Sequence, residues 1–307
     1  MEMIGKVRIE DEFYSGRDLY ADGGEDMLLE IVKAHPASEY EQIIKEKKDW
    51  AVLYHLSENR GNIVDWMEND KGASVLEVGA GCGAVTGKLA EKYGKVTCVE
   101  LSRKRSLVNA YRHQEKDNIE IKLGNYKDIS ASLEEKYDII TLIGVFEYAA
   151  GYMGTENPYE DFLISLKQHL KPDGKILIAI ENQFGLKYWA GCVEDHRQTL
   201  YEGLEGYWNI RNVRTFTKEG LERVVKRSGC TIEKFYYPYP DYKFPLSIYS
   251  DDYLPRIGEL NNNFNNFDAS RLVTFDESKV FDTIIEENKF PEFSNSFFIV
   301  VKEGTDQ

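Results

Sequence analysis

An apolar run that ends in three alternating glycines limits the fold of this chain more than any other segment. Residues 75–87 are VLEVGAGCGAVTG, in which Gly79, Gly81 and Gly83 follow the run directly and helix-forming residues come next. Glycine permits a tight turn and lets the backbone approach a ligand closely. The pattern therefore predicts a buried strand, a ligand-binding turn and a helix in direct succession.

Strand-like and helix-like segments alternate along the rest of the chain. Short apolar runs predict seven strands, which lie within residues 73–81, 95–102, 119–126, 137–148, 175–182, 230–240 and 294–303. The fourth run is almost wholly apolar, as expected where helices cover both faces of a parallel sheet. We therefore predict a Rossmann-like α/β fold with a seven-stranded, mostly parallel sheet, helices on both faces and an antiparallel last strand beside the sixth.

Segments outside the alternating pattern predict further parts of the chain. Residues 25–66 carry apolar side chains at three- and four-residue steps, which predicts a helical extension or lid over residues 1–66. The core is expected over residues 67–240. An insertion that contains the polar tract NNNFNNF covers residues 241–292, and the last strand and tail cover residues 293–307.

Charge and cysteine spacing exclude several classes of protein. Asp and Glu number 53 against 38 Lys and Arg, and the net charge of −15 repels phosphate backbones and anionic lipid. The chain has neither a leader-like start nor an apolar run of the roughly 20 residues that cross a bilayer. The four cysteines are far apart, as is typical of free thiols in a reducing compartment. We therefore predict a cytoplasmic protein without membrane contacts, whose oligomeric state the sequence leaves open.

Two carboxylates flank the glycine turn. Glu77 lies inside the first strand, where a carboxylate is costly unless it meets a partner. Glu100 ends the second strand, at the place where a carboxylate typically accepts hydrogen bonds from a ribose diol. The spacing is G-x-G-x-G and differs from the G-x-G-x-x-G dinucleotide fingerprint. A glycine-rich NAD site and an empty Rossmann-like domain are the alternatives.

With these features, residues 75–174 resemble the class I methyltransferases that depend on S-adenosylmethionine. The resemblance implies S-adenosylmethionine as the cofactor, with Glu100 on the ribose hydroxyls. It places Asn125 and Tyr126 beside the adenine, although the family often has Asp where this chain has Asn125. It also places Val145 and Phe146, after the fourth strand, beside the sulfonium. The implied cofactor-binding residues are Glu77, Gly79, Ala80, Gly81, Gly83, Glu100, Leu101, Asn125, Tyr126, Val145 and Phe146.

The first two strands are also similar to those of the RNA adenine dimethyltransferases. Those enzymes need an N/D-P-P-Y/F motif after the fourth strand, which holds the amine of a flipped base and stacks on it. This chain has GVFEY at residues 144–148, and the near-match ENPY at residues 156–159 has one proline and lies about ten residues too late. Together with the acidic net charge, this disfavours nucleic acid as the acceptor.

Several longer segments resemble bacterial methyltransferases that are encoded with, or fused to, glycosyltransferases for surface polysaccharide. They are LYHLSENRGNIVDW, IENQFGLKYWAG with the following EDH, and YPYPDYKFPLSIYSDDYLP. This resemblance implies O-methylation of a sugar or other small-molecule hydroxyl, with a small-molecule or glycan acceptor and a glycosyltransferase as a candidate partner. A cofactor-binding scaffold without catalysis is the alternative, and the 241–292 insertion could be a lid, an acceptor pocket or a dimer contact.

The expected place of the chemistry is the carboxyl end of the strands, because ligands of open α/β sheets lie there. This places Glu147 and Glu181 nearest the transferred methyl group. A weakly acidic hydroxyl needs a base, and His196 is the first choice because its unperturbed pKa lies near neutrality. Asp195 or Glu194 could orient it, although EDHR could equally be a solvated turn. The predicted catalytic residues are therefore His196, Glu181 and Asp195, and no metal site is predicted.

Overall fold

The structure is a computed structural model that describes residues 1–304 except 19, 22, 209–211 and 264–270, so part of the polar tract at residues 261–267 lies outside the described residues. The chain divides into two compact units, which are described separately. The first is Met1–Leu142 with Gln168–Gly174, and the second is Ile143–Lys167 with Lys175–Gln307. No helix in the described residues is long and apolar enough to cross a membrane.

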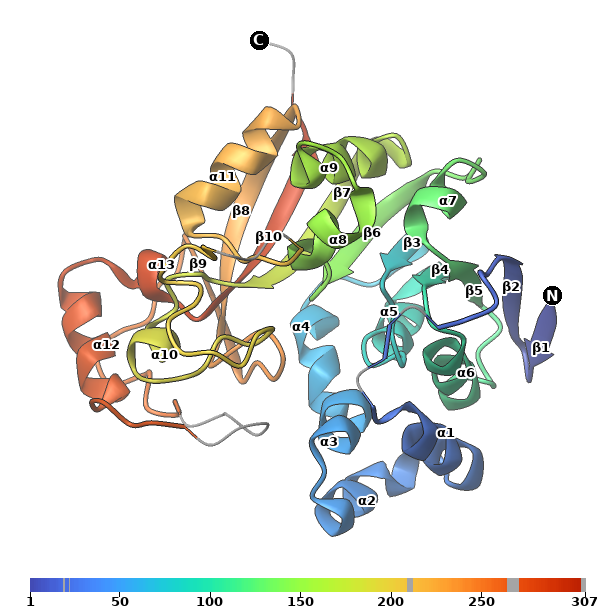
Figure 1. Cartoon of the computed structure of the whole chain (residues 1–307), viewed down its shortest axis with the longest axis horizontal. Helices are drawn as coiled ribbons and strands as arrows, with labels where there is room; N and C mark the ends of the chain where they lie inside the picture. Colours follow the sequence, from blue (N-terminus) through green and yellow to red (C-terminus); the bar gives the residue numbers. More distant parts are fainter. Residues whose placement is uncertain (19, 22, 209–211, 264–270, 305–307) are drawn as a thin grey trace. The chain divides into compact units, whose positions relative to one another are not determined.

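The first unit contains most of the parallel strands (Figure 1). These strands are β1 (Glu2–Ile4), β2 (Val7–Phe13), β3 (Asp70–Val78), β4 (Tyr93–Glu100), β5 (Ile119–Gly124) and β6 (Tyr137–Ile143). They are ordered β1-β2-β5-β4-β3-β6, and every neighbouring pair except β1 and β2 is parallel. Because β3 has a parallel neighbour on each edge, the turn that follows it lies at the carboxyl edge of the sheet.

Helices of the first unit form its second layer. They are α1 (Glu25–Ala34), α2 (Tyr40–Lys47), α3 (Trp50–Leu56), α4 (Asn62–Asp65), α5 (Thr86–Lys92), α6 (Arg103–Arg112) and α7 (Tyr126–Ser130), with 3-10 turns η1 (Ala37–Glu39) and η2 (Glu58–Gly61). Buried apolar residues of α1, α2 and α3 pack in one cluster with Cys82 and Val108. The N-terminal helices therefore share a core with α6 and with the glycine turn.

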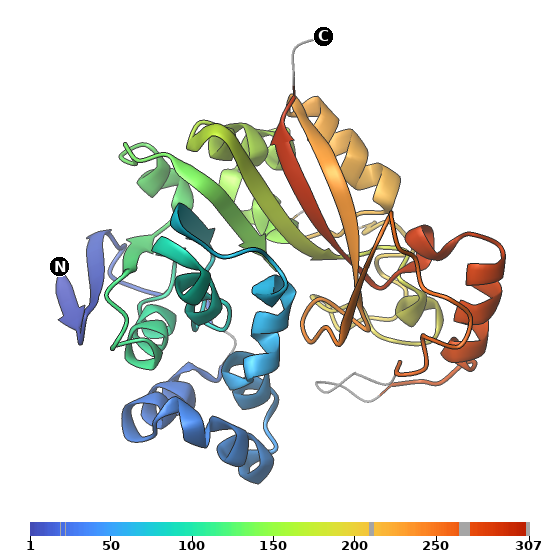
Figure 2. The same cartoon turned by 180° about the vertical axis from the view of Figure 1, so that it is seen from behind.

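The second unit is built around antiparallel strands (Figure 2). They are β7 (Leu170–Glu181, whose first residues belong to the first unit), β8 (Cys230–Tyr239), β9 (Ser247–Ser250) and β10 (Ser296–Glu303). Strand β10 lies between β7 and β8 and is antiparallel to both, with Phe298 opposite Ala179 on one side and Tyr236 on the other. The predicted antiparallel pairing of the last strand with the strand at residues 230–240 is confirmed.

The remaining helices belong to the second unit. They are η3 (Phe146–Tyr148), α8 (Ala149–Met153), α9 (Pro158–Lys167), α10 (Leu186–Trp189), α11 (Lys218–Arg227), α12 (Glu277–Glu286) and α13 (Phe290–Phe293). Helix α11 begins at an N-cap, where the Thr217 side chain accepts a hydrogen bond from the Gly220 N–H, as the sequence predicted. Leu221, Val224 and Val225 form its buried face.

The described residues contain ten strands instead of the predicted seven, while the α/β class and the mostly parallel arrangement are confirmed. The seven predicted segments all form strands, and β1, β2 and β9 are additional. Strand β2 is VRIEDEF, in which buried Val7 and Ile9 alternate with charged side chains. Its high charge concealed this alternation, and β9 has only four residues. The predicted boundaries at residues 66, 240 and 292 stay predictions.

Candidate functional site

The glycine turn directly after β3 has the geometry that its sequence demands. Gly79, Gly81 and Gly83 have φ angles of +72°, +56° and +76°, in the left-handed region that glycine adopts at little cost. A Cβ on Gly83 would lie 2.3 Å from the side-chain oxygen of Asn109, so only glycine allows α6 to pack this closely. The turn is therefore set by backbone conformation and by close approach together.

Glu100, the last residue of β4, holds the glycine turn. Its side chain is buried, and Oε2 accepts a hydrogen bond of 2.7 Å from the Gly81 N–H. Oε1 accepts the N–H groups of Leu101 and Ser102 at 2.8 and 2.9 Å. Each carboxylate oxygen has two lone pairs, so Glu100 can hold the turn and still accept a ribose hydroxyl. The sequence indicated only the second of these roles.

Glu77 is buried within β3 and does find partners. Its Oε2 accepts hydrogen bonds from Thr86 Oγ1 at 2.6 Å and from Cys98 Sγ at 3.5 Å. Burial raises the pKa of Glu77 to about 7, and these two hydrogen bonds only partly oppose that rise. A carboxyl group next to the glycine turn therefore titrates near neutral pH.

The raised pKa of Glu77 predicts a pH-dependent stability. Between about pH 4.5 and 7 the folded chain keeps a proton that the unfolded chain loses, so the stability contribution falls as pH rises through this window. Glu77→Gln removes this titration. From pH 5 to pH 8 we expect the free energy of unfolding of Glu77→Gln to rise relative to wild type by about 3 kcal/mol in urea titrations. Glu115→Gln, on an exposed glutamate, should show no such trend, and a flat difference for Glu77→Gln would contradict the prediction.

The two residues expected beside the adenine face different environments. Asn125 caps α7 through its Oδ1, which accepts the Lys127 N–H at 3.1 Å. Its amide NH₂ has no hydrogen-bond partner among the described residues and is able to donate to an adenine edge. The Tyr126 side chain is buried, with its ring edge-on to His169 at 6.5 Å between centroids. Their contacts with the cofactor stay predictions.

Helix α6 links the N-terminal helices to the glycine turn. The guanidinium group of Arg112 donates hydrogen bonds to the carbonyl oxygens of His55, in α3, and Cys82. His113 Nε2 lies 3.0 Å from the carbonyl oxygen of Gly83. Burial lowers the pKa of His113 to about 3, so its neutral ring donates to that carbonyl. Arg112 thus links the N-terminal extension to the glycine turn by hydrogen bonds. The predicted role of the extension as a lid stays a prediction.

The second unit contains a buried group of charged side chains, here called the charged cluster. It consists of Glu147, Glu181, Glu194, Asp195, Asp241, Lys187, Lys243 and His196. Its members come from η3, the end of β7, α10 with the loop after it, and the connection between β8 and β9. The three predicted catalytic residues all belong to this cluster, so EDHR is not a solvated turn.

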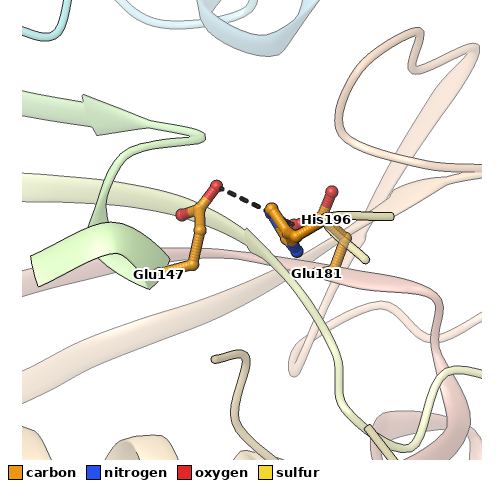
Figure 3. A group of neighbouring side chains, drawn as sticks. All are labelled: Glu147, Glu181 and His196. Carbon is orange, nitrogen blue, oxygen red and sulfur yellow. Dashed lines mark ion pairs between the residues drawn. The ribbon is translucent and has the colours of Figure 1, made fainter. Parts of the chain in front are cut away.

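His196 lies among Glu147, Glu181 and Glu194, and its side chain is 6% exposed. Figure 3 shows it beside Glu147 and Glu181. Its Nδ1 is 2.8 Å from Glu194 Oε1, and its Nε2 is 3.5 Å from Glu147 Oε1 and 3.9 Å from Glu181 Oε2. Burial would lower the pKa of His196, but these carboxylates outweigh burial and hold the pKa well above its ordinary value. The unperturbed pKa assumed from the sequence is therefore wrong for this environment.

Glu194, and not Asp195, orients the imidazole. Glu194 also accepts the backbone N–H groups of His196 and Arg197, both at 2.8 Å, which fix its position. Asp195 instead accepts a hydrogen bond from the Tyr188 hydroxyl and pairs with Lys187 and Lys243. The sequence predicted either Asp195 or Glu194 for this role. It could not decide between them, because adjacent side chains in a loop point in different directions.

Two carboxylates of the cluster keep an oxygen without a hydrogen bond. Lys243 pairs with Glu181 through Oε1, while the buried Oε2 atoms of Glu147 and Glu181 have no hydrogen-bond partner among the residues that the structure describes. Burial, with the nearby charge of Glu181, raises the pKa of Glu147 although His196 opposes it. Such oxygens are costly to bury and are available to a ligand.

Other expected site residues serve the core of the second unit. The ring of Phe146 is fully buried, with ring centroids of Tyr159, Phe162 and Phe216 at 5.5, 6.3 and 5.9 Å. Asn182 donates both amide hydrogens to the carbonyl oxygens of Glu292 and Ser294. The expected contact of Phe146 with the sulfonium stays a prediction, as does that of the half-buried Val145.

Lys243 is the cation on which the charged cluster most depends. It pairs with both Glu181 and Asp195, and its side chain is only 15% exposed. Lys243→Met leaves two buried carboxylates without this partner, so we expect a loss of about 3–5 kcal/mol in the free energy of unfolding, measured in urea. Lys279→Met, on a side chain that is 83% exposed, should change it by less than about 1 kcal/mol. Equal effects of the two variants would contradict this prediction.

Comparison with known families decides the class of the protein. Residues 76–176 match the model of a family described as a methyltransferase domain, and this range begins in β3 and includes the glycine turn and Glu100. Residues 76–176 therefore form a methyltransferase domain. The predicted family and its cofactor, S-adenosylmethionine, are thereby confirmed. None of the curated proteins matches the sequence of this methyltransferase.

Solved structures share the fold of the methyltransferase at low sequence identity. A chain from the complex of the Haloferax volcanii Trm112 methyltransferase activator with a protein described as a methyltransferase is 14% identical, with a TM-score of 0.51, and the match covers 93% of this chain and 100% of that one. The CcbJ methyltransferase from Streptomyces caelestis is 16% identical, with a TM-score of 0.48 and coverage of 81% and 90%. A Haemonchus contortus phosphoethanolamine N-methyltransferase is 14% identical, with a TM-score of 0.48 and coverage of 94% and 53%. At 14% identity, the first of these likenesses shows the fold alone.

Proposed function

We propose that this methyltransferase transfers the methyl group of S-adenosylmethionine to a hydroxyl group of a sugar or another small molecule. The observation that carries the proposal is the charged cluster, in which His196 is held among three carboxylates and two buried oxygens have no hydrogen-bond partner in the described part of the chain. A hydroxyl group donates one hydrogen bond and accepts others, so it can bind such oxygens through its O–H.

Two observations disfavour a nucleobase as the acceptor. The net charge of −15 opposes the approach of a phosphate backbone. Enzymes that methylate a flipped base stack an aromatic side chain on it, but Phe146, in the matching segment, lies in the core of the second unit. An acceptor without a phosphate backbone fits these features better. The glycosyltransferase partner rests on sequence resemblance alone and stays a prediction.

The residues of the first unit are able to hold the cofactor. When bound, S-adenosylmethionine supplies an electrophilic methyl group. We assign a ribose hydroxyl to the remaining lone pair of Glu100 Oε2 and the adenine edge to the amide NH₂ of Asn125. The turn offers the cofactor a backbone surface formed by Gly79, Ala80, Gly81 and Gly83. Its three glycines have positive φ angles and no Cβ, so the ligand can approach the backbone closely.

The proposed reaction is an in-line displacement. The acceptor oxygen forms a bond to the methyl carbon as the carbon–sulfur bond breaks, and the hydroxyl proton leaves to a neighbouring group. Positioning of the two reactants accounts for much of the rate in such a reaction. In this proposal the charged cluster positions the hydroxyl and receives its proton.

Transfer of a labelled methyl group tests the proposal. The purified chain is incubated with methyl-labelled S-adenosylmethionine and with fractions of a bacterial lysate that separate glycans, nucleotide sugars, other small molecules and RNA. We expect the label in a saccharide or small-molecule fraction that resists nuclease. The carbon chemical shift of the transferred methyl group should then identify a methyl ether.

The outcome also separates the alternatives. Label in RNA, or a methyl group bonded to nitrogen, would contradict O-methylation of a small molecule. Binding of S-adenosylhomocysteine without transfer to any fraction would favour the non-catalytic scaffold. Gly81→Arg serves as the negative control for every fraction.

A further inference from the structure

The residues that the charged cluster brings together have the composition of a metal site. We propose that Glu147, Glu181 and His196 bind a divalent first-row transition-metal ion such as Zn²⁺ or Mn²⁺ (Figure 3). Each offers one ligand atom, and these atoms all lie within 4.8 Å of one another. The sequence predicted no metal because these residues are far apart along the chain and form no recognisable ligand spacing.

The distances suit ligands of one ion. His196 Nε2 lies 3.5 Å from Glu147 Oε1 and 3.9 Å from Glu181 Oε2. Metal–ligand bonds of about 2.0–2.2 Å place neighbouring ligand atoms roughly 3–4 Å apart, so small side-chain rotations would bring all three onto one ion. One imidazole with two carboxylates favours Zn²⁺, Mn²⁺ or Fe²⁺ over Mg²⁺ and Ca²⁺, which prefer oxygen ligands alone.

The group behind His196 is of the kind that supports a metal ligand. Glu194 lies 2.8 Å from Nδ1 and is itself held by two backbone N–H groups and by the hydroxyl of Tyr207 at 3.2 Å. A carboxylate on Nδ1 fixes the ring and directs Nε2 toward the ion, as in the carboxylate–histidine–metal arrangement. In Figure 3 the Glu147 carboxylate points toward His196, whose Nε2 is the nearest ring nitrogen.

The charge balance of the cluster also favours a cation. Its five carboxylates outnumber its two lysines and His196 together, and both lysines pair with the side of the cluster formed by Asp195, Asp241 and Glu181 Oε1. Within the described ranges of the chain, the buried Oε2 atoms of Glu147 and Glu181 have no hydrogen-bond partner. Buried carboxylates require a compensating charge, and a divalent ion beside these two oxygens supplies it.

Metal binding is tested with neither cofactor nor acceptor present. The purified full-length chain is stripped with EDTA and titrated with Co²⁺ while its visible absorption is followed, and Zn²⁺, Mn²⁺ and Mg²⁺ are then added as competitors. We expect one Co²⁺ per chain, displaced by Zn²⁺. His196→Ala and Glu181→Gln should abolish the spectrum, and Glu194→Gln, which keeps all three ligands, should weaken binding by about 10–100-fold.

Controls separate this site from surface binding and from misfolding. His35 lies 2.7 Å from Glu39 on an exposed surface, so His35→Ala removes a histidine–carboxylate pair of similar type and should leave the titration unchanged. Each variant should keep the affinity of wild type for S-adenosylhomocysteine, which reports on folding. Absence of a Co²⁺ spectrum in wild type, or equal Co²⁺ spectra and affinities in wild type and His196→Ala, overturns the proposal. That result leaves the methyl-transfer assay unaffected, so the failures of the two proposals are distinguishable.

Discussion

Replacing Gly81 by arginine should raise the dissociation constant of S-adenosylhomocysteine by roughly 100-fold or more, a loss of about 2.7 kcal/mol. Gly81 has a φ angle of +56°, and a Cβ at this position would lie 3.1 Å from the guanidinium group of Arg105. The Gly81 N–H also donates the hydrogen bond through which Glu100 holds the turn. A bulky cation at Gly81 therefore strains the backbone and disturbs the residue expected on the ribose.

Isothermal titration calorimetry measures this effect directly. Gly258→Arg is the matched control, because Gly258 also has a positive φ, of +86°, and a Cβ there meets nothing within 4 Å. Its backbone strain should be similar, while its affinity for S-adenosylhomocysteine should remain that of wild type. If Gly81→Arg binds as tightly as wild type, the glycine turn is not part of the cofactor site.

Replacing His196 by alanine should lower the rate of methyl transfer by about 100–10,000-fold, the range typical of disrupted acid–base sites, because the carboxylates that position the hydroxyl lose the cation between them. The affinity for S-adenosylhomocysteine should change little, because most of its expected contacts belong to the first unit and His196 is not among them. His196 is the cation that faces Glu147 and Glu194, so its removal leaves the predicted acceptor side of the cluster without its central group. Single-turnover measurements with saturating cofactor report the chemical step.

Two further variants make this result interpretable. Glu194→Gln keeps His196 but replaces the carboxylate on Nδ1, so it should produce a smaller fall in rate than His196→Ala. His35→Ala, on an exposed histidine, should transfer methyl groups at the wild-type rate. If His196→Ala retains the wild-type rate, the charged cluster stabilises the second unit and has no part in catalysis.

Local sequence patterns predicted where helices, strands and turns lie better than they predicted the surroundings of individual side chains. The strand, glycine turn and helix at residues 75–87 were predictable because each depends on neighbouring residues: apolar periodicity, positive φ angles and helix propensity. Strand β2 was missed because charged side chains alternate with Val7 and Ile9 and conceal the apolar pattern. The role of Glu100 in holding the turn was missed because it depends on a backbone N–H from another element.

The candidate site depends on contacts between distant parts of the chain. The sequence by itself determined the α/β class, the glycine turn and the methyltransferase family, since these follow from contiguous residues. Only the tertiary structure decided that Glu194 orients His196, that Phe146 lies in the core, and that Glu147 and Glu181 share one cluster. Burial and charge at a residue depend on the groups that folding brings near it, and a linear pattern does not contain those distances.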